Sequence, residues 1–538
     1  MKLNKEALKE RYEFEKKGII LPRFDSDIVF ENTEKAPTWI HFGAGNIFRG
    51  FLARVAQVLL NEGLSDTGVI AADTFDYEII NKIYKPHDNL TLMADLKPTG
   101  DVSYEVIGSI PFALCANFKY EEDHKKLLKI FTAPSLQLVS FTITEKGYSL
   151  RSMDGNLLPV VVSDAENGPS CPNHAMSIVC SMLLERFKNG ALPLAVVSMD
   201  NCSHNGDKLK SSILEIASMW KEKGFVDDSF IAYLNDETKI SFPWSMIDKI
   251  TPRPDASVEK MIKDDLGIDD MAPITTDRGT FIAPFVNAEV PQYLVIEDSF
   301  PNGRPQFEKA GVYMTDRDTV NKSERMKVTT CLNPLHTSLA VFGCLLGYTR
   351  ISDEMKNPTL VSLITKMGYD EGLKVVTDPK ILSPEAFITE VIKERLPNPY
   401  IPDAPQRIAT DTSLKVPIRF GETIKSYIAS DELDVTSLTY IPLTIAGWFR
   451  YLLGVDDNGN KMELSSDPLM EDLQKELSNV KFGEPQSAFG NIDGLLRNKS
   501  LFAADLVECG LKEKIEVMLS DMLKGNGAVL STITKYVG

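Results

Sequence analysis

The segment Ser323–Ser338 contains residue types that suit proton transfer. Glu324, Lys327, Asn333 and His336 fall within 13 residues, ahead of an apolar helical pattern. Oxidation of an alcohol needs a base that takes the hydroxyl proton while hydride leaves the same carbon. A lysine can be that base when burial or a cationic neighbour lowers its pKa from about 10.4 toward roughly 7–8. The amide N–H groups of an asparagine can stabilise the developing oxyanion.

The same segment also has a purely structural interpretation. Asn333-Pro334 is a favourable helix start, with asparagine at the N-cap and proline at the first helical position. In that case Asn333 only caps the helix, His336 only fills its first turn, and Lys327 is solvated. The segment alone leaves both interpretations open.

A second stretch, Trp39–Phe51, has the layout of a phosphate-binding turn. The apolar run Thr38–Phe42 predicts a buried strand, Gly43-Ala44-Gly45 a turn, and Phe51–Leu60 a helix. This layout places backbone N–H groups and the positive end of a helix against a pyrophosphate. The predicted cofactor contacts are Gly43, Ala44, Gly45, Asn46, Ile47, Phe48 and Arg49.

The glycines of this stretch differ from the usual dinucleotide fingerprint. Gly43 is expected to make the tight turn and Gly45 to let the backbone approach the phosphates. Phe48 stands where the third glycine belongs, and Gly50 comes two residues later. Strand–turn–helix units with two glycines are also common packing devices, which is the alternative here.

Further buried strands are predicted at Gly68–Asp73, Leu136–Thr144 and Leu194–Asp200, alternating with helices. This alternation predicts a doubly wound parallel sheet, whose ligands bind beyond the carboxyl ends of the strands. Asp73, 28 residues after Gly45, is the candidate for binding the adenosine ribose, and Asp76 is the second candidate. The alternative is a loop acid that caps the next helix.

Other polar residues lie in positions where a ligand could reach them. Asn201 and Asn205 follow a predicted strand, and Asp248 stands in a turn-rich segment. Arg407 and Lys415 could hold a carboxylate or hydroxyl groups. Surface loops and solvated charges explain each of these residues equally well in isolation.

The chain divides by its patterns into an α/β part and a helical part. Residues 2–18 predict a surface helix, and Pro22–Pro37 a connecting arm. The proline-rich region 240–310 predicts a link without a long helix. Long helices are expected later, at Leu335–Tyr348, Pro384–Leu396 and Thr439–Leu453. We predict an α/β domain at 1–300, a mainly α-helical domain at 301–538, and the ligand site between them.

Composition excludes several classes of function. The net charge of −18 argues against binding to nucleic acid and fits poorly with an anionic membrane. Seven cysteines without a Cys-x-x-Cys pair, and only six histidines, argue against a disulfide framework and a metal site. The mixed-charge start predicts no signal peptide, and no apolar run is expected to approach membrane-spanning length. A cytoplasmic location is expected.

Six motifs together resemble the polyol-specific long-chain dehydrogenase family, which includes mannitol dehydrogenases and hexuronate reductases. They occur in order between about 38 and 420, and no later segment adds a motif. The motifs are Gly43-Ala-Gly-Asn-Ile-Phe-Arg-Gly50, Thr144-Glu-Lys-Gly-Tyr148, Met199-Asp-Asn201 with Asn205-Gly206, Phe242-Pro-x-Ser-Met-Ile-Asp248-Lys-Ile-Thr-Pro252, Lys327 with Leu332-Asn333-x-x-His336, and Arg407 with Lys415-x-Pro417.

The resemblance implies a zinc-independent, NAD(P)-dependent oxidoreductase with a Rossmann-type domain followed by a helical domain. It implies that Lys327 is the general acid/base, that Asn201 and Asn333 are the oxyanion donors, and that Glu324 belongs to the proton path. The implied substrate-binding residues are Asp248, His336, Arg407 and Lys415.

One spacing differs from the family pattern. Family members have four residues between the lysine and the asparagine, whereas Val328–Leu332 makes five here. On one straight helix the extra residue would rotate Lys327 by about 100° relative to Asn333. Pro334 suggests instead that a new helix starts at Asn333 and leaves the lysine on a separate segment.

Within the family, the sequence is most similar to the hexuronate reductase branch. This implies that D-fructuronate and D-mannonate are interconverted with NAD, since an acid at Asp73 or Asp76 disfavours the 2′-phosphate of NADP. Tagaturonate reductase, a mannitol-type polyol dehydrogenase and a non-catalytic nucleotide sensor remain alternatives. The expected partner is a small sugar acid or polyol, and the oligomeric state stays open.

Overall fold

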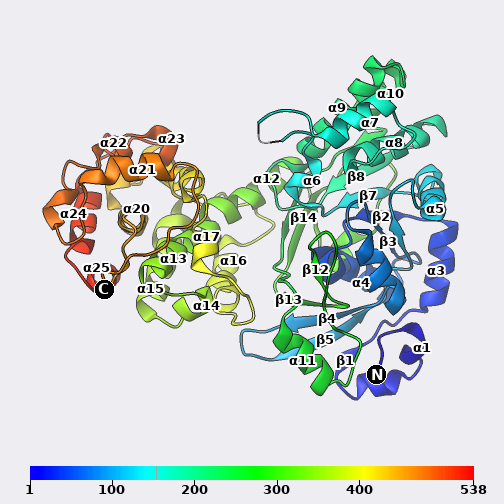
Figure 1. The fold of residues 1–538 in the computed structure, drawn as a ribbon, viewed down its shortest axis with the longest axis horizontal. Coiled ribbons are helices and arrows are strands. Elements are labelled where there is room, and N and C mark those ends of the chain that lie inside the picture. The colour runs from blue at the N-terminus through cyan, green and yellow to red at the C-terminus, as the bar shows by residue number, and fades with distance from the viewer. Residues whose placement is uncertain (153) are drawn as a thin grey trace. The chain divides into compact units, whose positions relative to one another are not determined.

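A computed structural model describes residues 1–152 and 154–538 and divides them into two compact units (Figure 1). The N-terminal unit consists of Met1–Leu96 and Asp101–Asn321. The C-terminal unit consists of Lys97–Gly100 and Lys322–Gly538.

A six-stranded parallel sheet forms the centre of the N-terminal unit. Its spatial order is β6 (Ala113–Cys115), β3 (Val69–Asp73), β2 (Trp39–Phe42), β7 (Leu138–Phe141), β8 (Leu194–Ser198) and β9 (Ile240–Ser241). Numbered along the chain, this is the order 3-2-1-4-5-6 of dinucleotide-binding folds. The predicted doubly wound parallel sheet is confirmed, and the strand order reverses between β2 and β7, directly beside the glycine turn.

Both faces of this sheet are covered, which explains why its strands are continuous apolar runs. One face carries Ile40 and Phe42 and packs with residues of α5 (Glu121–Thr132), α8 (Ala175–Lys188) and α9 (Asn205–Glu222). The other face packs with η1 (Phe48–Leu52), α4 (Ala53–Asn61) and η2 (Ile79–Tyr84). The predicted helix Phe51–Leu60 is therefore present, although its first turn is a π-helix.

The expectation of a link over residues 240–310 is wrong. The region contributes β10 (Ser245–Asp248), β13 (Phe285–Glu289) and β14 (Tyr293–Glu297) to two further sheets, ordered β1-β5-β4-β13 and β10-β14-β15. The other strands of these sheets are β1 (Ile19–Ile20), β4 (Thr91–Leu96), β5 (Val102–Ile107) and β15 (Tyr313–Thr315). The prolines that suggested a link lie between strands of only four or five residues. They therefore mark the ends of these strands and do not interrupt them. The one helix of this region, α11 (Ala256–Asp264), is short.

Two expectations for the first 37 residues are also wrong. Residues 2–18 form two short helices, α1 (Lys5–Leu8) and α2 (Arg11–Glu15), in place of one. The expected arm contains α3 (Ser26–Lys35), which Asp25 caps by accepting the N–H groups of residues 27 and 28. Since α3 buries only two of its residues, its apolar pattern is too narrow to be visible in the sequence.

The C-terminal unit is mainly helical, as predicted. The three expected helices are α13 (Asn333–Leu345), α16 (Pro384–Glu390) continued by η8 (Val391–Arg395), and α20 (Tyr440–Leu452). The other α-helices are α14 (Ile351–Glu354), α15 (Pro358–Lys366), α17 (Pro405–Ile408), α18 (Thr412–Val416), α19 (Glu422–Ile428), α21 (Met470–Glu476), α22 (Asp493–Leu496), α23 (Lys499–Phe502), α24 (Lys512–Met522) and α25 (Ala528–Val537). Helices α13 and α20 are buried over nearly their whole length, so they form the core of this unit.

One helical stretch, Arg317–Leu345, is long and apolar enough to cross a membrane by length and composition alone, contrary to expectation. It comprises α12 (Arg317–Met326), η5 (Lys327–Cys331) and α13. The core helices of folded domains can have the same length and hydropathy. Since 78% of its most apolar part is buried inside the protein, this stretch is such a core helix.

Candidate active site

The glycine turn after β2 presents backbone to a ligand. Gly43 has a φ of +106°, and a Cβ there would stand 2.2 Å from the carbonyl oxygen of Thr142, so only glycine fits. A Cβ at Gly45 would meet no atom within 4 Å, which leaves this side of the turn open. The helix begins at Asn46, and its first N–H groups have no acceptor within the helix. These features fit the pyrophosphate of a dinucleotide.

Side chains of the same turn are used to anchor it. Arg49 is fully buried and donates from Nη1 to the carbonyl of Ala283 (2.7 Å) and from Nη2 to Oδ1 of Asn46 (2.7 Å). Asn46 in turn donates to the carbonyl of Pro252. Burial lowers the pKa of Arg49 to about 10, so the guanidinium remains charged at neutral pH. The side chains of Asn46 and Arg49 therefore hold the turn, and contact of either residue with a cofactor stays a prediction.

Phe48 and Gly50 explain the altered fingerprint. Phe48 is buried and stacks on His41, with ring centroids 4.3 Å apart. A Cβ at Gly50 would stand 2.9 Å from Cγ1 of Val286 and 3.3 Å from Sδ of Met93. Gly50 thus allows the first helical turn to pack closely on the β4–β13 pair. The third glycine of the usual fingerprint also allows close packing, there between the helix and the strand that precedes it.

Asp73, the last residue of β3, and Asp76 are both buried. Asp73 accepts the N–H groups of Phe75 (2.8 Å), Asp76 (2.8 Å) and Ala44 (3.1 Å), which precede the helix that begins at Tyr77, so Asp73 does not cap that helix. Burial raises the pKa of Asp73 against the effect of these three donors. One oxygen of Asp76 accepts the hydroxyl of Thr276, and the other is buried without a partner among the residues described. Ribose binding by either acid stays a prediction.

An exposed pair beside these acids escaped sequence reasoning. The ring of Phe75 is 60% exposed, and the guanidinium of Arg278 lies 4.9 Å from its centroid. Arg278 comes from the tip of the hairpin β11–β12 (Ile274–Thr275 and Phe281–Ile282), 203 positions further along the chain. No local pattern joins the two residues, so the sequence offers no signal for the pair.

Asn201 lies in a loop that its neighbours hold tightly. The preceding Asp200 accepts the N–H groups of Ile143 and Thr144 and the hydroxyl of Tyr148. The amide of Asn205 donates to the carbonyl of Asp200 and to Ser245, so Asn205 is a structural latch. Asn201 itself is exposed. Elsewhere in the N-terminal unit, Asp248 is buried at the end of β10.

The Lys327 segment contains a π-helical turn. In η5 the N–H of Leu332 donates to the carbonyl of Lys327 across five residues (3.1 Å), and α13 then begins at Asn333. A π-turn accommodates one residue more than an α-turn, so the extra residue between Lys327 and Asn333 is absorbed there. The predicted helix start at Asn333 is confirmed, but Lys327 is not on a separate segment, because it lies on the preceding turn of the same helical stretch, Arg317–Leu345.

The structural alternatives for this segment are wrong. Lys327 is only 2% exposed, so it is not a solvated lysine. The N-cap position of α13 belongs to Leu332, and the side chain of Asn333 makes no capping hydrogen bond. Within the described residues Asn333 and Glu324 form no side-chain hydrogen bond or ion pair, and both are half-buried. Their polar groups are therefore available to a ligand.

His336 pairs with an acid that was not predicted. Its Nε2 lies 2.6 Å from Oδ2 of Asp403, and the other carboxylate oxygen of Asp403 pairs with Arg407. Burial raises the pKa of Asp403, but the hydrogen bond and charge of His336 and the charge of Arg407 outweigh burial and leave this pKa below its ordinary value. The i, i+4 spacing of Asp403 and Arg407 was the available signal.

The two predicted cations differ in what they contact. The side chain of Arg407 is 68% exposed and already paired with Asp403. The ammonium of Lys415 donates to the carbonyls of Ile408 (2.9 Å) and Thr410. Burial, followed by the charge of Arg419, lowers the pKa of Lys415 to about 8. Arg419 was not predicted, although it lies one helical turn after Lys415.

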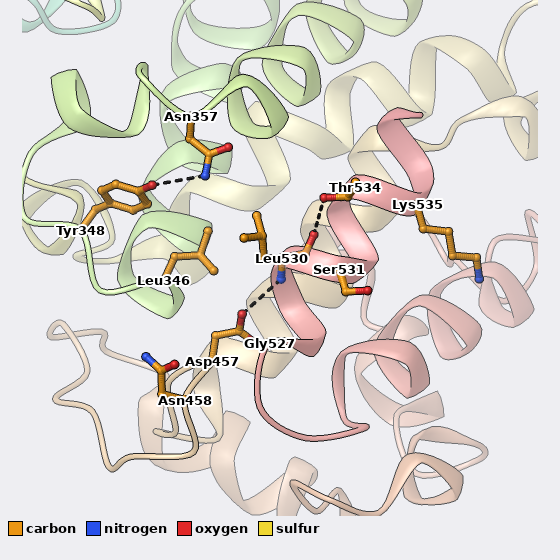
Figure 2. A pocket seen from close by; sticks show the side chains of 10 residues that line it. All are labelled: Leu346, Tyr348, Asn357, Asp457, Asn458, Gly527, Leu530, Ser531, Thr534 and Lys535. Atoms are coloured by element: carbon orange, nitrogen blue, oxygen red, sulfur yellow. Dashed lines mark hydrogen bonds between the residues drawn. The ribbon is translucent and has the colours of Figure 1, made fainter.

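The predicted residues do not line the cavity of about 770 Å³ in the C-terminal unit, which lies between Tyr348, the 457–458 turn and α25 (Figure 2). Its two charged side chains are committed elsewhere: Asp457 accepts the N–H groups of Val529 and Leu530, and Lys535 pairs with Asp521. In the described part of the chain, no three His, Cys, Asp or Glu side chains gather where they could hold a metal ion.

Comparison with known proteins agrees with this architecture. Residues 37–309 match the model of the mannitol dehydrogenase Rossmann domain, and residues 319–522 match that of the mannitol dehydrogenase C-terminal domain. A D-mannonate oxidoreductase of Thermotoga maritima is 53% identical over 100% of this chain and 99% of its own length.

Two solved structures share the fold over nearly the whole chain. The ternary complex of Pseudomonas fluorescens mannitol 2-dehydrogenase with NAD and D-mannitol has a TM-score of 0.69 and 26% identity, and it covers 99% of both chains. A substrate-free D-sorbitol dehydrogenase has a TM-score of 0.76 and 25% identity, and it covers 97% of this chain and 100% of its own. The chain therefore belongs to the mannitol dehydrogenase family of oxidoreductases.

Proposed function

We propose that this protein is an NAD-dependent hexuronate reductase that interconverts D-fructuronate and D-mannonate. The observation that carries the proposal is the 53% identity, over the full length, to a D-mannonate oxidoreductase. The NAD complex of the mannitol 2-dehydrogenase and the open backbone at Gly45 support NAD as the cofactor. When bound, NADH supplies the hydride that reduces the keto carbon.

In this proposal Lys327 is the general acid in the direction of reduction. It donates a proton to the carbonyl oxygen and takes that proton back in the direction of oxidation. Its burial supports the role, because an ammonium removed from water gives up its proton more readily. Glu324 lies one helical turn before Lys327 and forms no ion pair within the described residues, so it is the proposed relay between the lysine and solvent.

Asn333 and Asn201 are the proposed donors to the oxygen that becomes the alkoxide. The amide of Asn333, at the start of α13, makes no hydrogen bond within the described residues. This supports the role, because its N–H groups can donate to the substrate oxygen without breaking another hydrogen bond. The tight hydrogen bonding around Asp200 and Asn205 supports a fixed position for the Asn201 backbone.

The proposed substrate-binding residues are Asp248, His336, Arg407 and Lys415. Nε2 of His336 lies 2.6 Å from Oδ2 of Asp403, which leaves the other ring nitrogen to bind a substrate hydroxyl. The cations Arg407 and Lys415 favour a sugar acid. We place the reaction in the cytoplasm, a location that the free thiols of all seven cysteines suit.

Turnover by the purified, metal-free protein tests the proposal. D-fructuronate, D-tagaturonate and D-fructose are each offered with NADH and with NADPH, and oxidation of the cofactor is followed by absorbance. We expect rapid turnover of D-fructuronate with NADH. Turnover of tagaturonate alone or fructose alone would show that this compound, and not D-fructuronate, is the substrate. Binding of NADH without turnover of any of the three would overturn the proposed reaction.

A further inference from the structure

Three cations lie close together along residues 405–421 of the C-terminal unit, and they differ in how their charge is balanced. Arg407 pairs with the carboxylate of Asp403. Lys415 donates to two backbone carbonyls. Arg419, in η9 (Pro417–Gly421), has one hydrogen bond within the described residues, from Nη1 to the hydroxyl of Thr337. The charge of Arg419 is therefore not neutralised by any described acid.

Two buried arginines of this protein, Arg186 and Arg450, donate mainly to backbone carbonyls. Arg186 donates to five backbone carbonyls, those of residues 131, 133, 136, 192 and 193. Arg450 gives each of its three nitrogens a carbonyl acceptor. These two guanidinium groups tie segments of backbone together. Arg419 ties only one hydroxyl, so a structural role leaves most of its donors unexplained.

The position of Arg419 also brings like charges together. Lys415 and Arg419 are four residues apart on one helical run, and the charge of Arg419 disfavours the charged form of Lys415. Burial lowers the pKa of Arg419 to about 10, which leaves it charged at neutral pH. Asp411 and Asp467 raise the pKa of Lys415, but neither forms an ion pair with Lys415 or Arg419 within the described residues. An anion that binds beside the two cations would therefore be attracted by both charges.

The anchor of Arg419 connects it to the candidate active site. Thr337 directly follows His336 on α13, four residues after Asn333. The guanidinium is thus held next to the residues proposed to bind the substrate, and Thr337 fixes its position through a single hydrogen bond. The planar fork of an arginine matches a carboxylate through two parallel N–H donors.

We propose that Arg419 binds the carboxylate of the substrate and thereby selects a sugar acid over a neutral polyol. This inference rests on the proposed function and names the residue that sets its substrate class. Arg407, which the sequence suggested for this role, is already paired with Asp403, so less of its charge remains for a substrate carboxylate than at Arg419.

The proposal is tested by Arg419→Met, which keeps the length of the side chain and removes its charge. We expect KM for D-fructuronate to rise about 10- to 100-fold with a smaller change in kcat, since the lost contact is made to a part of the substrate that does not react. Arg419→Lys keeps the charge without the fork and is expected to be intermediate. Lys425→Met removes an exposed cation of α19 and serves as the matched control, with KM unchanged.

Calorimetric titration of the protein with NAD⁺ present gives a second measurement. Wild type is expected to bind D-mannonate more tightly than D-mannitol, and Arg419→Met to lose this preference by weakening D-mannonate alone. An equal loss for both ligands, or no loss for either, would overturn the role of Arg419. If Arg419→Met does not fold, the same comparison is made with Arg419→Lys, where an unchanged preference overturns the proposal.

The two proposals fail separately. If wild type reduces D-fructuronate and Arg419→Met does so with the same KM, the inference fails and the proposed function stands. If wild type reduces none of the three ketoses but binds D-mannonate in a manner that depends on Arg419, the proposed reaction fails and the carboxylate site stands.

Discussion

The glycine turn of the N-terminal unit and the Lys327 segment of the C-terminal unit use polar residues in opposite ways. Around Gly43–Gly45, the side chains of Asn46, Arg49 and Asp73 bond to the protein itself. The N–H groups of Gly43 and Ala44 have acceptors within the protein, whereas the first N–H groups of the helix that begins at Asn46 have none within the helix. In the Lys327 segment the backbone is closed into helices, and the side chains of Glu324 and Asn333 remain uncommitted.

This difference follows from the chemistry expected of each region. A pyrophosphate is bound by rigid backbone donors, so side chains there are best used to keep the turn in place. A reacting carbonyl needs groups that gain or lose protons and that donate to a developing charge, which only side chains provide. A residue's contacts therefore predict whether its loss harms stability or turnover.

Lys327→Ala is expected to give the largest effect. If Lys327 moves the proton, kcat falls by about 10²–10⁴-fold while NADH still binds with similar affinity. Steady-state kinetics and titration of NADH fluorescence measure the two quantities. Lys380→Ala, which removes an exposed lysine, is the control and should change neither. Wild-type turnover in Lys327→Ala would leave the protein without its proposed acid.

Asn333→Ala is expected to give the second largest effect. Loss of one oxyanion donor is expected to lower kcat by about 10²–10³-fold, because the amide acts on charge that develops in the transition state. Since Asn333 makes no capping hydrogen bond, the melting temperature should stay close to that of wild type. A large drop in melting temperature with normal kcat in the surviving enzyme would return Asn333 to a structural role.

Arg49→Met tests the opposite side of the comparison. It leaves the carbonyl of Ala283 and Oδ1 of Asn46 without their donors inside the protein. We expect the melting temperature to fall by about 5–10 °C, with kcat of the folded enzyme little changed. Differential scanning fluorimetry and kinetics separate the two. An unchanged melting temperature with a weakened affinity for NADH would instead show direct contact of this side chain with the cofactor.

Glu354→Gln tests a polar group that has no hydrogen-bond partner and is closed off from solvent. Glu354 is fully buried, neither oxygen has a hydrogen-bond partner in the described structure, and a Cβ at Gly343 of α13 would stand 2.1 Å from Oε1. Burial, and then the charge of Asp403, raise the pKa of Glu354 to about 9. The acid is therefore protonated at neutral pH. It occupies space beside α13 that a side chain at position 343 would fill.

The expected pH dependence has a definite sign. Between the unfolded value of 4.5 and the folded value of about 9, the folded state holds a proton that the unfolded state has lost, so stability falls as pH rises through this range. Glutamine cannot titrate. Wild type and Glu354→Gln should melt together near pH 5, and the variant should melt about 2–5 °C higher near pH 9. Parallel melting curves across this range would contradict a buried neutral acid.

Sequence reasoning succeeded where the relevant residues are neighbours in the chain. The strand, turn and helix around Gly43, the helix start at Asn333 and the long helices after 325 all follow from apolar period and local turn chemistry. It failed for α3 and for the strands of 240–310, because a narrow apolar stripe and very short strands carry little periodic signal.

The sequence by itself determined the fold class, the glycine turn and which residue types could move a proton. Only the tertiary structure decided which of them are free to act. Arg49 meets Ala283 across 234 positions, and Asp76 meets Thr276 across 200. Such partners are set by the packing of distant segments, which leaves no mark on local spacing. The same packing left the charge of Arg419 without an acid, and for that reason Arg419 could be recognised only in three dimensions.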